Sequence, residues 1–152
     1  MWRFVVVAVG FVAVGALAAP PTPAQSVKYR HEVMEAAGGH MGALAMIVKG
    51  ESDRAQDAAL HANALRDLAL TMGGLFPAGS GPAPGLETDA KPEIWSQADK
   101  FAAAVKKMET EATKLAEVAK GGDLAAIKTQ FGAVGGACGD CHDAYKVDED
   151  HH

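Results

Sequence analysis

Hydrophobic side chains recur at helical spacing along four stretches of the chain. Residues 26–49, 53–72, 92–119 and 124–145 each carry apolar positions three and four apart. That spacing places the apolar side chains on one face of a helix, and no useful length of chain alternates as a strand does. The pattern therefore predicts four amphipathic helices.

Residues that start or stop helices stand between these stretches. Gly50 follows the first stretch, as a C-terminal glycine does, and Pro92 suits the first position of the third helix. Ser52 or Asp53 is the expected N-cap of the second helix, and Asp123 is the expected N-cap of the fourth.

Residues 75–90 separate the first pair of helices from the second pair. Proline and glycine are frequent there and no period is visible, so we expect a crossing loop. The links within each pair are short, which favours antiparallel neighbours. The whole pattern predicts an all-α protein, an antiparallel four-helix bundle.

The composition excludes several classes of function. The 152 residues make one domain, and the formal net charge of -5 argues against nucleic acid as a partner. Two cysteines permit at most one disulfide, so the fold is not a disulfide scaffold. The sequence has no Ser/His/Asp pattern, H-E-x-x-H motif or phosphate loop, and we expect no enzymatic activity.

The first residues read as a targeting segment. Arg3 precedes an apolar run over residues 4–18, which ends in the small-x-small site Ala16-Leu17-Ala18. This run is shorter than the roughly 20 residues of a membrane span, which disfavours the alternative of a membrane anchor. We predict a signal peptide over residues 1–24, cut after a position from 18 to 24. The bundle of residues 25–152 is then periplasmic and has no membrane span.

The chemistry lies in the last predicted helix. Cys138-Gly139-Asp140-Cys141-His142 is a C-x-x-C-H motif, the signature of covalent attachment of haem c. The cysteines are one helical turn apart and face the same way, so their sulfurs can bond to the two vinyl groups of one porphyrin. His142 then supplies the proximal ligand of the iron.

Paired cysteines also serve other sites. A thioredoxin-like pair of cysteines lies where a strand leads into a helix, and the predicted bundle has no such strand. A structural zinc site takes four ligands, for which only His151 and His152 in the tail could add nitrogen. A haem-free bundle that binds a metal or a partner is the remaining alternative, and the motif argues against it.

The chain resembles the class II cytochromes c, the family of cytochrome c′ and cytochrome c-556, and is closer to the c-556 subgroup. The resemblance implies a four-helix bundle with one covalent haem c. It spans nearly the whole mature chain and rests on Tyr29-Arg30, Val33-Met34, residues 48–51, residues 75–77, residues 91–95 and residues 138–146.

The resemblance also implies which residue faces the distal side of the haem. In the family this residue stands four positions after an arginine of the first helix, and here Met34 follows Arg30 at that spacing. We expect Met34 to ligate the iron, which makes the protein a one-electron carrier with low-spin, His/Met-ligated iron. If Met34 only blocks the site, the iron is five-coordinate and binds nitric oxide or carbon monoxide.

Other side chains complete the expected site. Arg30 is expected to reach a haem propionate, and the alternative is a solvated charge on the helix face. Tyr145, one turn beyond Cys141, is expected to touch the haem ring. Met41 is the rival of Met34 as a ligand, although core packing is its simpler role. The expected partners are periplasmic redox proteins, for a chain that is a monomer or a homodimer.

Overall fold

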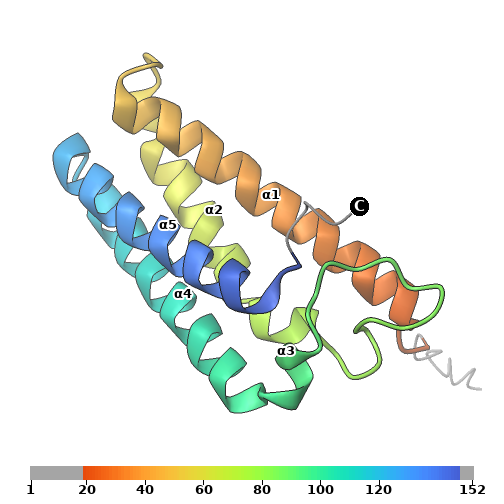
Figure 1. Ribbon diagram of the computed structural model, residues 1–152. Helices are drawn as coiled ribbons and strands as arrows, with labels where there is room; N and C mark the ends of the chain where they lie inside the picture. Colours follow the sequence, from red (N-terminus) through yellow and green to blue (C-terminus); the bar gives the residue numbers. More distant parts are fainter. Residues whose placement is uncertain (1–18, 148–152) are drawn as a thin grey trace, which may run out of the picture.

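The computed structural model describes residues 19–147, so most of the predicted signal peptide and the last five residues lie outside the described part. Within it, four long helices form an antiparallel bundle (Figure 1), and the predicted all-α four-helix fold is confirmed. The elements are α1 (Pro23–Lys49), η1 (Ala55–Asp57), α2 (Ala58–Ala69), η2 (Met72–Leu75), α3 (Glu93–Ser96), α4 (Ala98–Ala119) and α5 (Leu124–Tyr145).

Local capping determines where the first and the last helix of the chain, α1 and α5, begin. A capping box precedes α1, in which the Thr22 hydroxyl accepts from the Gln25 backbone N–H and the Gln25 side chain accepts from the Thr22 N–H. The predicted stop at Gly50 is confirmed, because this residue adopts the left-handed conformation with φ 75°. Asp123 caps α5 as predicted, accepting from the backbone of the first turn.

The second helix differs from its prediction. Neither Ser52 nor Asp53 caps it, because α2 begins only at Ala58, after the short η1 turn. The Ser52 hydroxyl accepts instead from the Arg54 backbone N–H. At its other end α2 stops at Ala69 rather than continuing to residue 72, and the chain tightens into η2.

The third helix is broken, although the prediction was a continuous helix from Pro92. Gln97 leaves the helical conformation, with φ -124° and ψ 46°, and the chain turns sharply between α3 and α4 (Figure 1). The break lets the short helix bury Ile94. It also lets the Trp95 indole N–H donate to the Phe76 and Pro77 carbonyls at 3.2 and 3.3 Å.

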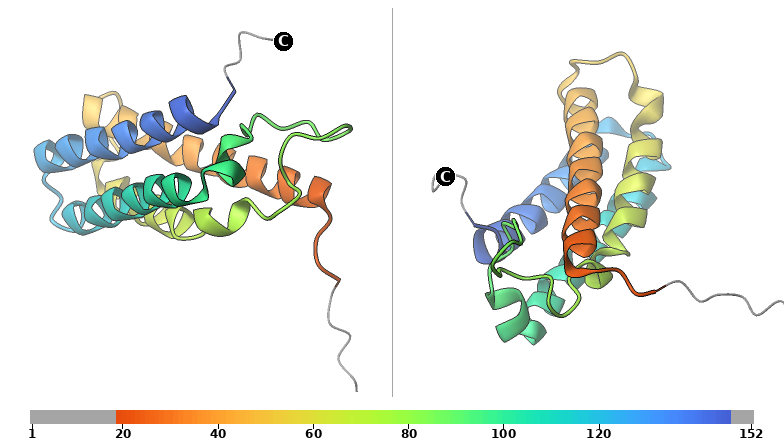
Figure 2. Two further views of the ribbon diagram at one scale, coloured as in Figure 1. Left: turned by 60° about the horizontal axis from the view of Figure 1, so that its bottom comes forward. Right: turned by 90° about the vertical axis from the view of Figure 1, so that its right-hand side faces the viewer.

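The core has two parts of unequal size. The large cluster joins α1, α2, α4 and α5, and the small cluster lies at the end of the bundle that carries the crossing loop (Figure 2). The buried residues of the small cluster are Ala90, Ile94, Phe101 and Val105. Those of the large cluster are Leu44, Ile47, Ala58, Ala62, Leu65, Ala69, Met108, Ala112, Leu115, Ala119, Ile127, Val134 and Ala137.

The end of the crossing loop is fastened to the end of α5. The Lys91 backbone N–H donates to the Tyr145 carbonyl at 2.8 Å, and the Val147 N–H donates to the Asp89 carbonyl at 2.7 Å. The loop thus closes the end of the bundle at which α5 terminates (Figure 2). Among the described helices, none is both long and apolar enough to cross a bilayer.

Candidate functional site

The two cysteines of the motif face the interior from α5. Both are half-buried free thiols, and Cys138 Sγ lies 3.7 Å from Met108 Sδ of α4. Cys141 packs against the small cluster, one turn further along. Burial raises the pKa of both thiols, and the pKa of Cys141 is raised further by the charge of Cys138. The sulfurs thus stand on one face of the helix, at the junction of the two core clusters.

His142 lies at the outer side of this junction. The residue is exposed, yet partial desolvation of its ring lowers the pKa, and the charge of Lys146 one turn later lowers it further, against a smaller opposing effect of Asp143. A lowered pKa keeps the imidazole neutral near neutral pH. A neutral imidazole is the form that ligates a metal.

Aromatic rings connect the end of α5 with the loop. The Tyr145 ring meets the Phe101 ring edge to face at 5.1 Å, and the Phe101 ring meets the Phe76 ring at 4.8 Å. The Arg30 guanidinium carbon lies 4.8 Å from the centre of the Phe76 ring. These contacts join the neighbourhood of Cys141 to that of Arg30.

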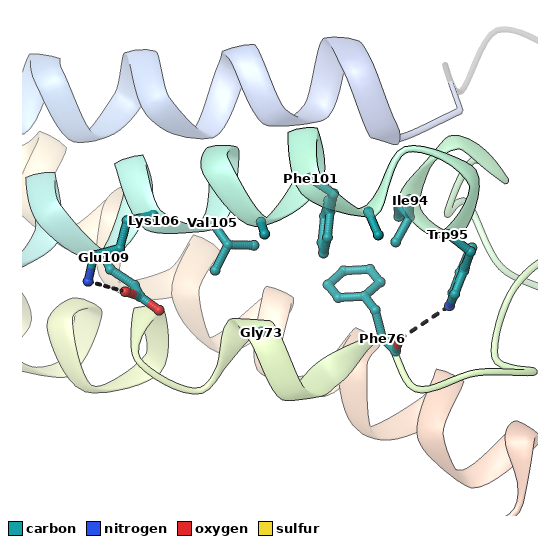
Figure 3. A pocket seen from close by; sticks show the side chains of 10 residues that line it. Gly73, Phe76, Ile94, Trp95, Phe101, Val105, Lys106 and Glu109 are labelled. Atoms are coloured by element: carbon teal, nitrogen blue, oxygen red, sulfur yellow. Dashed lines mark hydrogen bonds and ion pairs between the residues drawn. The ribbon is translucent and has the colours of Figure 1, made fainter.

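A cavity of about 460 Å³ lies beside the rings of Phe76 and Phe101 (Figure 3). Phe76 and Phe101 point into it between η2 and α4, and Lys106 and Glu109 stand at the opposite end (Figure 3). None of the residues of the C-x-x-C-H motif lines this cavity. It is bounded by Gly73, Phe76, Ile94, Trp95, Ala98, Phe101, Ala102, Val105, Lys106 and Glu109.

Arg30 is buried, with 5% of its surface exposed, so it is not a solvated charge on the helix face. Its guanidinium donates to the Leu75 carbonyl at 3.2 Å, to the hydroxyl and carbonyl of Ser80 at 3.1 and 3.0 Å, and to the Thr88 hydroxyl at 2.7 Å. These acceptors are neutral, and no carboxylate of the described residues forms an ion pair with it. Desolvation accordingly lowers the pKa of Arg30.

Counting turns from one contact between α1 and α5 indicates that Met34 lies near the level of His142. Met41 of α1 lies beside α5, because a Cβ added at Gly135 would stand 3.9 Å from its terminal methyl. The helices run antiparallel (Figure 1), so Met34, two turns before Met41, corresponds to His142, two turns after Gly135. Met41 packs against the large cluster, whereas Met34 is half-buried and belongs to neither cluster.

A pair of histidines between α1 and α2 was not predicted from the sequence. His40 of α1 and His61 of α2 are both half-buried, and their Nδ1 atoms are 2.9 Å apart. The signal was present, because the two residues stand at equal distances on either side of the turn at Gly50 and Glu51. In an antiparallel helical hairpin, such residues face each other.

The arrangement fits a covalent haem. Two inward thiols one turn apart match the two vinyl groups, and a Cβ built at Gly139 between them would meet nothing within 4 Å. Cys141 and Tyr145 both pack against the small cluster, in which the Phe101 ring meets the Tyr145 ring. A buried guanidinium without an anionic partner suits a carboxylate-bearing group. The fold and the site together define a c-type cytochrome built on a helical bundle.

Comparison with known proteins identifies the family. The family model described as Cytochrome C' matches residues 25–146. Cytochrome c' of Pararhodospirillum photometricum is 37% identical over 82% of this chain and 98% of its own, and cytochrome c-556 of Agrobacterium tumefaciens is 34% identical over 80% and 94%. A nitric oxide complex of a cytochrome c' mutant from Alcaligenes xylosoxidans superposes with a TM-score of 0.75, at 31% identity over 83% of this chain and 97% of its own. The chain belongs to the cytochrome c' family and carries a single covalent haem c.

Proposed function

We propose that Cys138 and Cys141 hold the haem through thioether bonds and that His142 is the proximal ligand of its iron. The support is the position of the motif on α5, where both thiols face inward and the histidine lies on the outer side. Tyr145 contributes a ring beside the attachment site. Arg30 offers its buried charge to a propionate, which would supply the anion that the described residues do not supply.

The bound haem supplies an iron whose remaining coordination position can take a small diatomic gas or stay closed. Counting turns from Met41 puts Met34 near this level of α1, and its side chain belongs to neither core cluster, so we assign it the place over that position. The gas-binding function uses Met34 as a steric gate and leaves the iron five-coordinate. Its ligand is nitric oxide or carbon monoxide.

The match to cytochrome c' over residues 25–146 carries this proposal, together with the nitric oxide complex of a relative with the same fold. The findings favour gas binding over the electron carrier that the sequence analysis placed first. The carrier is the second candidate, because Met34 bears a thioether at the level of His142 and a relative is named cytochrome c-556. The carrier would exchange electrons with periplasmic redox proteins.

Two substitutions at one position separate these functions. Met34→Leu removes the sulfur and keeps the bulk, whereas Met34→Ala removes both. For a gate, both variants keep the five-coordinate spectrum of the wild type, and Met34→Ala binds carbon monoxide about tenfold faster, which corresponds to a barrier lower by about 1.4 kcal/mol. For a ligand, both variants change the wild-type spectrum from low-spin to high-spin.

The experiment uses holoprotein from the periplasmic fraction, and its intact mass reports whether a leader was removed between positions 18 and 24. Optical spectra of the ferric and ferrous forms, with and without carbon monoxide, give the readout. Met41→Leu is the matched control, because this side chain packs in the core and should leave the spectrum unchanged. A low-spin wild type that does not react with carbon monoxide would refute the gas-binding function.

A further inference from the structure

The histidine pair between α1 and α2 lies outside the haem site and has no role in either candidate function. His40 and His61 approach each other through their Nδ1 atoms at 2.9 Å, with ring centres 5.2 Å apart and planes inclined by 55°. A hydrogen bond at this distance requires a proton on one Nδ1 and a lone pair on the other. The two rings therefore face each other through the same nitrogen.

We propose that His40 and His61 form a binding site for a divalent transition-metal ion, with Cu²⁺ as the preferred ion and water in the remaining positions. Both imidazoles can be neutral and offer Nδ1 as ligand, if the bridging proton moves to Nε2 of the same ring. This tautomeric change releases no net proton. Neutral imidazole is a common ligand of copper, nickel and zinc.

The separation of the nitrogens can be compared with the geometry that each ion prefers. Metal–imidazole bonds of about 2.0–2.1 Å place two nitrogens about 3.3 Å apart at a tetrahedral angle, and about 2.9 Å apart at a right angle. The observed 2.9 Å is the length of a hydrogen bond, and an ion held at a right angle would need almost no change in this separation. Adjacent positions at a right angle are those of a square-planar or tetragonal ion, Cu²⁺ or Ni²⁺, rather than of tetrahedral zinc. Copper also binds most tightly in the general order of divalent ions.

The two helices hold the ligands in place before any ion binds. Leu44, one turn after His40, and Leu65, one turn after His61, are both fully buried in the large cluster. The carboxylate of Asp57, one turn before His61 at the end of η1, already accepts a 2.6 Å bond from Arg54. The described residues contain no cluster of three metal-ligating side chains, so this is a site of two protein ligands.

The test measures Cu²⁺ binding to ferric holoprotein in a buffer that does not chelate metals. His151 and His152 are replaced by serine in every variant, because adjacent tail histidines bind the same ions. His40→Gln and His61→Gln each remove one ligand, and His31→Gln is the matched control, since His31 is exposed on the same helix. Titration calorimetry and the melting temperature report binding, because an ion that binds only the folded chain stabilises it.

We expect one Cu²⁺ per chain, a melting temperature that rises with Cu²⁺, and nitrogen coupling from two imidazoles in the electron paramagnetic resonance spectrum. Each of the two ligand variants should lose at least tenfold in affinity, and the control should lose none. Equal Cu²⁺ affinity in all variants would overturn the proposal. Coupling to a single nitrogen in the protein that retains both His40 and His61 would also overturn it, and this measurement does not depend on how the variants fold. Binding of Zn²⁺ as tight as that of Cu²⁺ would overturn the right-angle geometry.

Discussion

Replacing Arg30 is expected to destabilise the protein strongly, because its charge organises the crossing loop from inside. The guanidinium makes four hydrogen bonds, to atoms of Leu75, Ser80 and Thr88, and Ser80 is fully buried. A hydrogen bond to a charged group contributes about 1.5–3 kcal/mol, and the four are not additive since they share one side chain. Relief of the desolvated charge, which lowers the pKa of Arg30, offsets part of the loss.

For Arg30→Met we therefore expect a loss of about 3–5 kcal/mol in the free energy of unfolding, because the change leaves several buried acceptors unpaired at a cost of about 1–3 kcal/mol each. Urea unfolding of the holoprotein measures it, and limited proteolysis within residues 76–92 reports whether the loop has loosened. Lys28→Met on the exposed face of α1 is the matched control and should change stability by less than about 0.5 kcal/mol.

Arg30→Lys separates the effect of the charge from that of the hydrogen bonds. A lysine retains the charge but lacks the planar guanidinium, which donates to carbonyls and hydroxyls at the same time. It should recover only part of the lost stability. A full recovery by lysine would show that the charge alone matters, and a loss below about 1 kcal/mol for Arg30→Met would refute the role of this side chain in holding the loop.

Two further predictions concern the turn after α1 and the loss of stability at low pH. Gly50→Ala should lower the free energy of unfolding by about 1–2 kcal/mol, because φ at this residue is 75°. Gly42→Ala lies in the interior of the helix with open space around it and should raise the free energy of unfolding by up to about 1 kcal/mol. Thermal melts that rank the two variants the other way would contradict this. Hydrogen bonds from Lys114 and Gln130 lower the pKa of Glu111, so its contribution is complete above the ordinary pKa of a glutamate and is lost as pH falls through the lowered value. Glu111→Gln should be slightly less stable than the wild type at neutral pH and equal to it in acid; a difference that persists in acid would show another origin.

Whatever depends on neighbours within one helix was predictable. The period of three and four places α5 correctly from residue 124 to residue 145, and the helical turn between Cys138 and Cys141 already orients both thiols alike. Gly50 and Asp123 act as expected, because a cap involves only the few residues around it. The C-x-x-C-H motif predicted the haem for the same reason, since all its chemistry lies within five consecutive residues.

Contacts between distant segments were not readable in this way. The break at Gln97 occurs because Ile94 is buried and Trp95 bonds to the loop, and both gains are tertiary. Sequence analysis could place Arg30 on a helix face but could not find its acceptors, which lie 45 to 58 residues further along the chain.

The sequence by itself determined that the chain forms an antiparallel helical bundle, the bounds of α5 and the attachment motif, because periodicity and spacing are properties of short stretches. Only the tertiary structure decided that Arg30 is buried among neutral acceptors and that two histidines of different helices share a hydrogen bond. The physical reason is that burial and long-range pairing depend on how the helices align, which no local pattern of residues records.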